Sequence, residues 1–319
     1  MTRSRVHLLI AAAIVAASAC RHDWDAYDPR LRRLVPPGAG SGGSSADGSS
    51  SSATVGPGGR GGSAGYGGAP VGRGGAGGGG GAGGCAPLGG AGYAAEVEAD
   101  GPVAYWRAGD PVGSTFAKDE VSGGDATCVG VVTFGVPGAI VGDADTAMAL
   151  DGTSYLTLYD NFDFVGSAPF TVEAWVKPDV RDDQYRWLFG KVIYDAMNHR
   201  TGYLAFTRQP GMDAMGFQRW LDEVPKAYVN VSDPPPPSVW SHFVARFDGQ
   251  RTGIWLNGML AGEGLPDTTA LPDHRGAFHW GADPAGTSRW IGSLDELAIY
   301  AAALDPCRIE AHYAAVAKL

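Results

Sequence analysis

Four blocks in the second half of the chain carry the pattern that decides the fold: FTVEAWVKP at Phe170–Pro178, WSHFVARFDG at Trp240–Gly249, IWLNG at Ile254–Gly258 and WIGSLDELAIY at Trp290–Tyr300. In each block apolar and polar residues alternate, a tryptophan is present, and Gly, Pro or Asp stands at or near a boundary. Alternation with a period of two is typical of antiparallel strands that bury one face. The blocks therefore predict a β-rich domain.

Shorter strand patterns fill the rest of the domain, and turn signals such as Asp151-Gly152 and Asn257-Gly258 separate them. Many short strands with turns at regular intervals predict a sandwich or a barrel. A run of four prolines at Pro234–Pro237 predicts a rigid loop of polyproline type. Besides the four blocks, strands are predicted at 103–107, 147–150, 155–158, 187–191, 203–207, 215–220, 227–231 and 278–280.

Two helices are predicted at the ends of the domain. A short one covers 93–99. The second begins near Asp305, the expected N-cap, with Pro306 as its first helical residue. We expect this terminal helix to pack onto the edge of the sandwich through three residues that share one face, Ile309, Tyr313 and Val316.

The first residues have the features of a bacterial signal peptide. Two arginines precede an apolar stretch that is too short for a stable membrane span. Small residues then precede Cys20, which resembles the lipobox, where the peptide is cut before the cysteine and lipid is attached to it. We expect a signal peptide over 1–19 and lipidation of Cys20. The alternative is an ordinary signal peptidase site near Ala19, without lipid.

Residues 20–37 are mixed in charge and lack a clear period, which favours a solvated juxtamembrane segment. Residues 38–84 are about half glycine, with serine and alanine making up most of the rest. Such a sequence buries too little apolar surface to offset the entropy of ordering, so we expect a disordered Gly/Ser-rich tether. Its mean reach as a Gly-rich coil is roughly 40 Å. The folded domain is expected over 85–319, at the outer membrane or cell surface.

The charge of the chain excludes one class of partner. The formal net charge is −10 at pH 7, and the domain contains no basic cluster, so we expect no nucleic-acid binding. After the signal peptide, no stretch is long and apolar enough to cross a membrane. Membrane contact is therefore expected only through the lipid anchor.

The order of the blocks resembles the LamG-like jelly roll of the concanavalin A-like lectin/glucanase superfamily. The resemblance starts with PVAYWR at 102–107, continues through AKDE at 117–120 and AMALDG at 147–152, and then follows the four blocks. It covers nearly the whole of 86–316, and the order of the blocks is more specific than any one of them. It implies an all-β fold in which two antiparallel sheets, one concave and one convex, pack face to face.

The resemblance also bears on the cysteines of the domain. Export makes disulfides possible, and Cys85 opens the domain while Cys307 closes it. Because the two ends of a jelly roll usually lie side by side, the resemblance implies the pair Cys85–Cys307. The second pairing left open is Cys128–Cys307.

Glucanase members of the superfamily carry two glutamates that flank an aspartate on one strand. Retaining hydrolysis needs two carboxyl groups about 5 Å apart. Glu173 stands alone on its strand face, and Asp295 and Glu296 are adjacent, so we expect them to point to opposite faces. We therefore predict that the domain is not an enzyme.

The resemblance implies a structural Ca²⁺, because many superfamily members hold one with an aspartate that starts the last long strand. Asp295 occupies that position, and Asp119 is the second carboxylate we expect in the site. The alternative is that Asp295 caps a turn and accepts hydrogen bonds from backbone amides. His242, His274 and His279 form no ligand pattern, and His242 is expected in the core or packed in a hairpin.

A ligand surface is expected on the concave sheet or its loops, since sugars stack on exposed aromatic faces with polar groups at their edges. Trp106, Trp175 and Trp240 belong to family blocks and are assigned to the core. The candidates lie outside those blocks, and the alternative is that they also fill the core; they are Trp187, Trp220, Trp280, Tyr194, Arg186 and Arg219.

The predicted function is the non-catalytic binding of a glycan or a surface protein by a LamG-like domain on a lipid-anchored surface protein. One rival is a structural or adhesion module that acts only through protein contacts. The other rival is a glycan-active hydrolase or lyase of unusual mechanism.

Overall fold

The computed structural model describes Leu88 and residues 92–316. They belong to the second of two compact units, Gly77–Leu319. The predicted signal peptide, the lipidation of Cys20, the segments 20–37 and 38–84 and the first cysteine of the domain lie outside the described residues and stay predictions. Within the described part, no helix is long and apolar enough to span a membrane.

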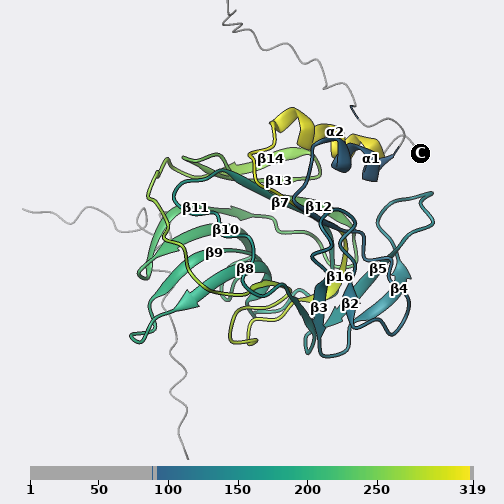
Figure 1. The fold of residues 1–319 in the computed structure, drawn as a ribbon, viewed down its shortest axis with the longest axis horizontal. Helices are drawn as coiled ribbons and strands as arrows, with labels where there is room; N and C mark the ends of the chain where they lie inside the picture. The colour runs from purple at the N-terminus through teal and green to yellow at the C-terminus, as the bar shows by residue number, and fades with distance from the viewer. Residues whose placement is uncertain (1–87, 89–91, 317–319) are drawn as a thin grey trace, which may run out of the picture. The chain divides into compact units, whose positions relative to one another are not determined.

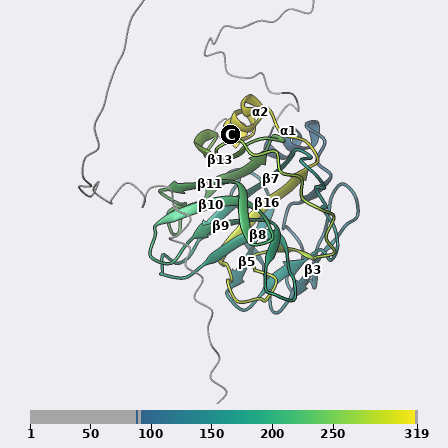
Figure 2. The same cartoon turned by 90° about the vertical axis from the view of Figure 1, so that its left-hand side faces the viewer.

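Two antiparallel sheets of eight strands each build the domain (Figure 1, Figure 2). The strands of sheet 1 are β1 (Ala104–Trp106), β4 (Thr133–Pro137), β5 (Thr146–Asp151), β7 (Phe170–Pro178), β12 (Ser241–Phe247), β13 (Thr252–Leu256), β14 (Met259–Glu263) and β16 (Ile291–Tyr300). Their order is β14-β13-β12-β7-β16-β5-β4, and β1 pairs with the second half of β16. All four blocks therefore lie in sheet 1.

Sheet 2 contains the remaining strands, none of which belongs to the four blocks. They are β2 (Phe116–Ala117), β3 (Ala126–Val129), β6 (Tyr155–Thr157), β8 (Arg186–Tyr194), β9 (Arg200–Arg208), β10 (Ala214–Leu221), β11 (Val224–Ser232) and β15 (Phe278–Trp280). Their order is β11-β10-β9-β8-β15-β6-β3-β2. The predicted all-β sandwich of two antiparallel sheets is confirmed.

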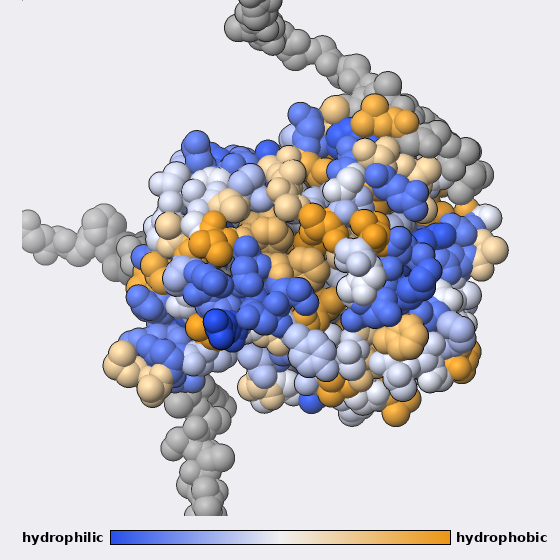
Figure 3. All heavy atoms as spheres, in the orientation of Figure 1, coloured by the Kyte–Doolittle hydropathy of each residue, from blue (hydrophilic) through white to orange (hydrophobic). Residues whose placement is uncertain are grey.

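The central core lies between the two sheets and follows the predicted alternation. Met215 and Phe217 of β10 point into it, and so do Phe243 and Ala245 of β12. Most of the surface seen in Figure 3 is hydrophilic, with apolar residues in smaller groups, as expected when the apolar faces of both sheets are turned inward.

Helices α1 (Tyr93–Ala99) and α2 (Pro306–Val316) cover the outer face of sheet 1. Together with Trp175, Val244 and Trp255 of three neighbouring strands, they form a second cluster, the outer core. Both helices occur where predicted, and Asp305 Oδ1 accepts a hydrogen bond from Cys307 N at 2.9 Å, which confirms the N-cap. The prediction that the terminal helix packs on the sandwich edge is wrong, because apolar side chains of β7, β12 and β13 face it.

Strand length is where the prediction departs most from the structure. Strands β2, β3 and β4 were not predicted, because they are short and β4 is interrupted by a glycine. Strands β8 to β11 extend beyond the predicted ends. Charged residues such as Arg200 and Arg208 end the apolar pattern there, yet both remain paired in the ladder between β8 and β9.

Of the two described cysteines, Cys128 is the one that carries a free thiol. This thiol is half-buried, and burial raises its pKa to about 11. The pairing Cys128–Cys307 is therefore wrong. The pairing Cys85–Cys307 involves a residue outside the described part and stays a prediction.

Candidate functional site

Two of the predicted ligand residues lie inside the domain. Trp280 belongs to the central core. The guanidinium of Arg219 lies 3.8 Å from the ring centroid of Phe247 and donates to the carbonyl oxygen of Gly166 at 2.8 Å. Burial lowers the pKa of Arg219 to about 10. For Trp280 and Arg219 the predicted ligand contact is wrong, because their side chains fill the interior.

Trp187 and Trp220 lie on the outer face of sheet 2. Trp187 rests on Gly190 of its own strand, where a side chain would meet the indole at 3.0 Å. Trp220 donates from Nε1 to Gln218 at 3.0 Å, and the guanidinium of Arg200 lies 3.9 Å from its ring centroid. Both tryptophans are nevertheless almost fully buried, at 4% and 1% exposed, and Trp220 has further contacts. They do not offer open ring faces, and among the predicted residues only Tyr194, at 40%, is well exposed.

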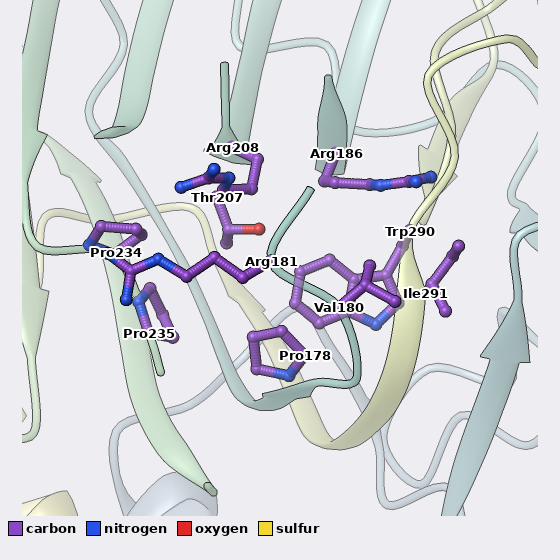
Figure 4. Close-up of a pocket in the computed structure, with 10 residues that line it drawn as sticks. All are labelled: Pro178, Val180, Arg181, Arg186, Thr207, Arg208, Pro234, Pro235, Trp290 and Ile291. Carbon is purple, nitrogen blue, oxygen red and sulfur yellow. The ribbon is translucent and has the colours of Figure 1, made fainter. Parts of the chain in front are cut away.

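A pocket opens at the end of the sandwich where β7 ends and β8 begins (Figure 4). Both sheets and three loops contribute to it. The lining residues are Pro178, Val180, Arg181, Arg186, Thr207, Arg208, Pro234, Pro235, Trp290 and Ile291. Of the predicted ligand residues, Arg186 lines it and the others do not. The proline run was a second sequence signal for this site, because two of its members belong to the lining.

The pocket arginines are held in place by two carboxylates. Asp182 accepts from Nε of Arg186 at 3.1 Å and from Nη2 of the same side chain, and Asp213 pairs with both Arg181 and Arg208. Arg186 and Arg208 are each bound at two or more points, which keeps a planar guanidinium in one orientation and fixes the direction of its remaining N–H groups. Arg181 pairs with Asp213 through one nitrogen, and its side chain is half exposed.

Trp290 also contributes a polar group to the lining of the pocket. Its side chain is buried, and Nε1 has no hydrogen-bond partner among the described residues. A buried N–H without an acceptor costs free energy, so a ligand atom that accepted a hydrogen bond from Trp290 Nε1 would remove this cost.

Glu173, the candidate closest to a glucanase carboxylate, is sealed under the helices in the outer core. Its oxygens accept from Tyr93 Oη at 2.5 Å and Tyr300 Oη at 3.2 Å, and lie 2.8 Å from His242 Nε2 and 3.0 Å from His312 Nδ1. Burial opposes ionisation, but the charge of His312 and these hydrogen bonds hold the pKa of Glu173 well below its usual value. Glu173 thus acts as the centre of a buried network, here named the Glu173 cluster.

The network continues to the end of α1. His312 Nε2 lies 2.8 Å from Asp100 Oδ2, and Arg308 pairs with Asp100 and with Glu96. Burial disfavours the charged imidazole, yet Glu173 and Asp100 raise the pKa of His312 to about 9. The Glu173 cluster therefore ties both terminal helices to the middle of sheet 1.

Asp295 and Glu296 do not point to opposite faces, so that prediction is wrong. Leu294 and Leu297 both enter the central core, and the pairing of β16 with β7 shifts register between Asp295 and Ala298. This is the signature of a β-bulge, in which one strand carries an extra residue. Both acidic side chains consequently lie toward the outer core.

The two carboxyl groups are almost fully buried, at 3% and 1% exposed. Asp295 Oδ2 accepts from the amide of Ala139 at 2.7 Å, while Oδ1 has no partner in the described part of the chain. Burial, and then the neighbouring Glu296, raises the pKa of Asp295 to about 8. Glu296 accepts from Tyr105 Oη and pairs with Arg107 at 2.9 Å, and burial raises its pKa to about 7.

Asp119, the second predicted metal ligand, caps a turn. Its oxygens accept from the amides of Tyr105 at 2.9 Å, Val121 at 3.0 Å and Gly124 at 3.1 Å, and from the hydroxyl of Ser122. Four donors use the four lone-pair directions of a carboxylate. Across residues 88 and 92–316, no group of three or more His, Cys, Asp or Glu side chains has the arrangement of a metal site.

Comparison with solved structures finds proteins whose fold is similar to that of this chain. The chain is similar to domain 4 of AbnA, a GH43 extracellular arabinanase from Geobacillus stearothermophilus, in complex with arabinotriose. Identity is 20%, coverage is 66% of this chain and 98% of that one, and the TM-score is 0.50. The binding domain of botulinum neurotoxin serotype G has 11% identity, coverage of 61% and 47%, and a TM-score of 0.44. The chain thus spans about half the length of that binding domain.

These likenesses concern the fold alone, and no curated protein matches the chain. A family model for the concanavalin A-like lectin/glucanases superfamily matches residues 150–310, which is half of the chain. The match includes all four blocks that first indicated the fold. The chain therefore belongs to the concanavalin A-like lectin/glucanase superfamily.

Proposed function

We propose that this domain is a non-catalytic carbohydrate-binding module and that the pocket at the end of the sandwich is its binding site. The observation that carries the proposal is the pocket itself: an open site in which oriented arginines, a buried indole and a rigid proline wall meet. Concave sites with a few convergent polar groups are where ligands bind. The arabinanase domain, whose structure holds arabinotriose, supports the proposal at the level of the fold.

The placement of the acidic residues supports binding without catalysis. Hydrolysis of a glycosidic bond needs two carboxyl groups that reach the substrate. Glu173, Asp295 and Glu296 are buried beneath the helices or in the bulge of β16, and the two carboxylates beside the pocket are held by arginines. A sugar in the pocket would meet guanidinium groups rather than an acid and a nucleophile.

The proposal includes display at the outer membrane or cell surface. The lipobox-like sequence before Cys20 and the Gly/Ser-rich tether support it. A lipid at Cys20 would hold the chain at the membrane, and the tether would let the domain reach a ligand away from that surface. Labelling cells with a radioactive fatty acid tests this part: the chain should take up label, and the Cys20→Ala variant should not.

Binding is tested with the full-length chain on a broad glycan array, followed by titration calorimetry with the best ligand. We expect saturable binding that the Arg208→Gln variant weakens by about tenfold, because one charge-assisted hydrogen bond is lost. Arg251→Gln is the matched control, since this arginine also pairs with a carboxylate but follows the opposite end of β12. Absence of binding to any glycan, or release of sugar from the array, would refute the proposal.

We also propose a structural Ca²⁺ at Asp295. The unpartnered Oδ1 of this buried carboxylate suits a cation. Gly138 lies against it, since an added Cβ there would be 3.1 Å from Asp295 Oδ2 and 3.0 Å from the carbonyl oxygen of Asp145. Asp119 does not fit the ion, because its lone pairs are already used. The ion would pin the loop between β4 and β5 to β16.

Calcium is tested by thermal unfolding with Ca²⁺ or EDTA. Ca²⁺ should raise the unfolding temperature of the wild type and leave that of Asp295→Asn unchanged, because a ligand that binds only the folded state stabilises it. Equal melting curves in Ca²⁺ and EDTA for the wild type would contradict the proposal.

A further inference from the structure

The pocket at the end of the sandwich presents donors and almost no acceptors. Arg181, Arg186 and Arg208 line it, and Trp290 adds an N–H without a partner in the described residues. Among the lining side chains, only the hydroxyl of Thr207 can accept a hydrogen bond. In Figure 4 the arginines come from neighbouring strands and the loop before β8, around the same opening.

The nearby carboxylates add no acceptors to the lining of the pocket. Both oxygens of Asp182 accept from Arg186, and the two oxygens of Asp213 are taken by Arg181 and Arg208. Each of these arginines has five N–H groups, and the bonds to these aspartates and to backbone carbonyls, such as the 2.7 Å bond from Arg186 to Arg289, use only part of them. The two aspartates keep further lone pairs, but neither of them lines the pocket, so the side-chain capacity that faces the pocket is mainly made of donors.

The size of the site limits what can enter. The space at its centre is about 10 Å³, which corresponds to roughly one water-sized group. A whole sugar ring does not fit there, whereas a single oxygen atom of a ring substituent does. The ring itself would lie at the mouth, beside the half-exposed Arg181.

We propose that the pocket selects the carboxylate of an acidic sugar, such as a uronic acid residue of a polysaccharide. A carboxylate only accepts hydrogen bonds, so it matches a lining that only donates, whereas a neutral sugar hydroxyl also brings a proton that needs an acceptor. This inference rests on the proposed carbohydrate binding and adds the chemical class of the ligand.

A matched ligand pair tests the inference. Oligogalacturonate and the same oligosaccharide after reduction of its carboxyl groups to alcohols are titrated into the full-length chain, at low and at high salt. The acidic oligosaccharide should bind at least about tenfold more tightly, and its advantage should shrink with salt, because salt screens exposed charges.

Variants connect that difference to the pocket. Arg181→Gln and Trp290→Phe should each reduce the preference for the acidic ligand, and Trp290→Phe keeps the apolar ring while removing the N–H donor. The control is again Arg251→Gln, which should preserve the preference. If Trp290→Phe fails to fold, the half-exposed Arg181 still decides the question.

The outcomes separate this inference from the proposed function. Equal affinity for the acidic and the reduced ligand would overturn the carboxylate preference and leave carbohydrate binding standing. A preference that survives Arg181→Gln would also overturn it, because the acidic group would then bind elsewhere. Binding to neither ligand nor to any other glycan would remove both proposals.

Discussion

Glu173 lies on a central strand, in a block whose sequence is typical of a half-buried strand, yet its carboxylate is fully buried. The fold offsets the cost of this buried charge with two tyrosines and two histidines. Such a carboxylate is fixed by its partners and has no lone pair to offer a substrate. The presence of Glu173 on this central strand is therefore not evidence for catalysis.

Replacing Glu173 with Gln should destabilise the domain by about 3–5 kcal/mol, because the charge of His312 would lose its buried partner. Urea denaturation measures the loss. Glu98→Gln serves as the control, since this residue of α1 is exposed. Equal stability of the two variants would show that the Glu173 cluster contributes little.

Asp119 provides a second test at the residue scale. Because it caps a turn with four hydrogen bonds, Asp119→Ala should lower the free energy of unfolding by about 1–3 kcal/mol, and by the same amount with Ca²⁺ or with EDTA. The exposed Asp273 gives the control variant, Asp273→Ala. A loss that occurs only in the presence of Ca²⁺ would restore Asp119 as a metal ligand.

At the scale of elements, α2 is held to sheet 1 by charge as well as by apolar contacts. Ile309 packs in the outer core, while His312 lies between Glu173 and Asp100. The tyrosines that face this imidazole have pKa values raised by burial and by Glu173. In the neutral and mildly alkaline range, the titration that weakens the contact is therefore that of His312.

The stability of the domain should depend on pH through His312. Its pKa is about 9 in the folded chain against an ordinary value of 6.5, so folding favours the protonated form. The stabilisation is fully present below pH 6.5 and is lost as pH rises through about 9. The shift corresponds to roughly 3 kcal/mol.

Urea denaturation at several pH values checks this dependence. The free energy of unfolding of the wild type should fall across this interval, and that of His312→Gln should change less. Parallel profiles for the two proteins would contradict the assignment.

On the acid side, Glu173 should contribute stability above its ordinary pKa of 4.5, and that contribution should be lost only as pH falls toward its lower folded value.

At the scale of the whole molecule, the two ends of the domain meet on the outer face of sheet 1. The amide of Leu88 donates to Glu96 at 2.9 Å, and Glu96 pairs with Arg308 at 2.5 Å. Leu88 follows Cys85 by three positions, and Arg308 directly follows Cys307. This proximity supports the disulfide that the jelly-roll resemblance implied.

Mass spectrometry of an unreduced digest should therefore find a peptide pair joined through Cys85 and Cys307, with Cys128 open to alkylation after unfolding. Reduction should lower the free energy of unfolding by about 2–4 kcal/mol, because a long loop of the unfolded chain is no longer closed. A joined pair that contains Cys128 would refute the assignment.

The sequence by itself determined the sandwich, the order of its four blocks, the position of α1 and the N-cap at Asp305. These features depend on local information: the alternation of each strand, the turn residues and the capping side chain. The sequence did not reveal the short strands β2 to β4, which are held mainly by their neighbours in the sheets.

Only the tertiary structure decided the chemistry of the sites. The bulge that turns Asp295 and Glu296 to the same side appears only when β16 is paired with β7. His312 reaches Glu173 across 139 positions of sequence, and the pocket collects arginines and Trp290 from segments of both sheets. Contacts between residues far apart in the chain leave no periodic signal, so the four blocks specified the scaffold and the packing of the sheets specified the site.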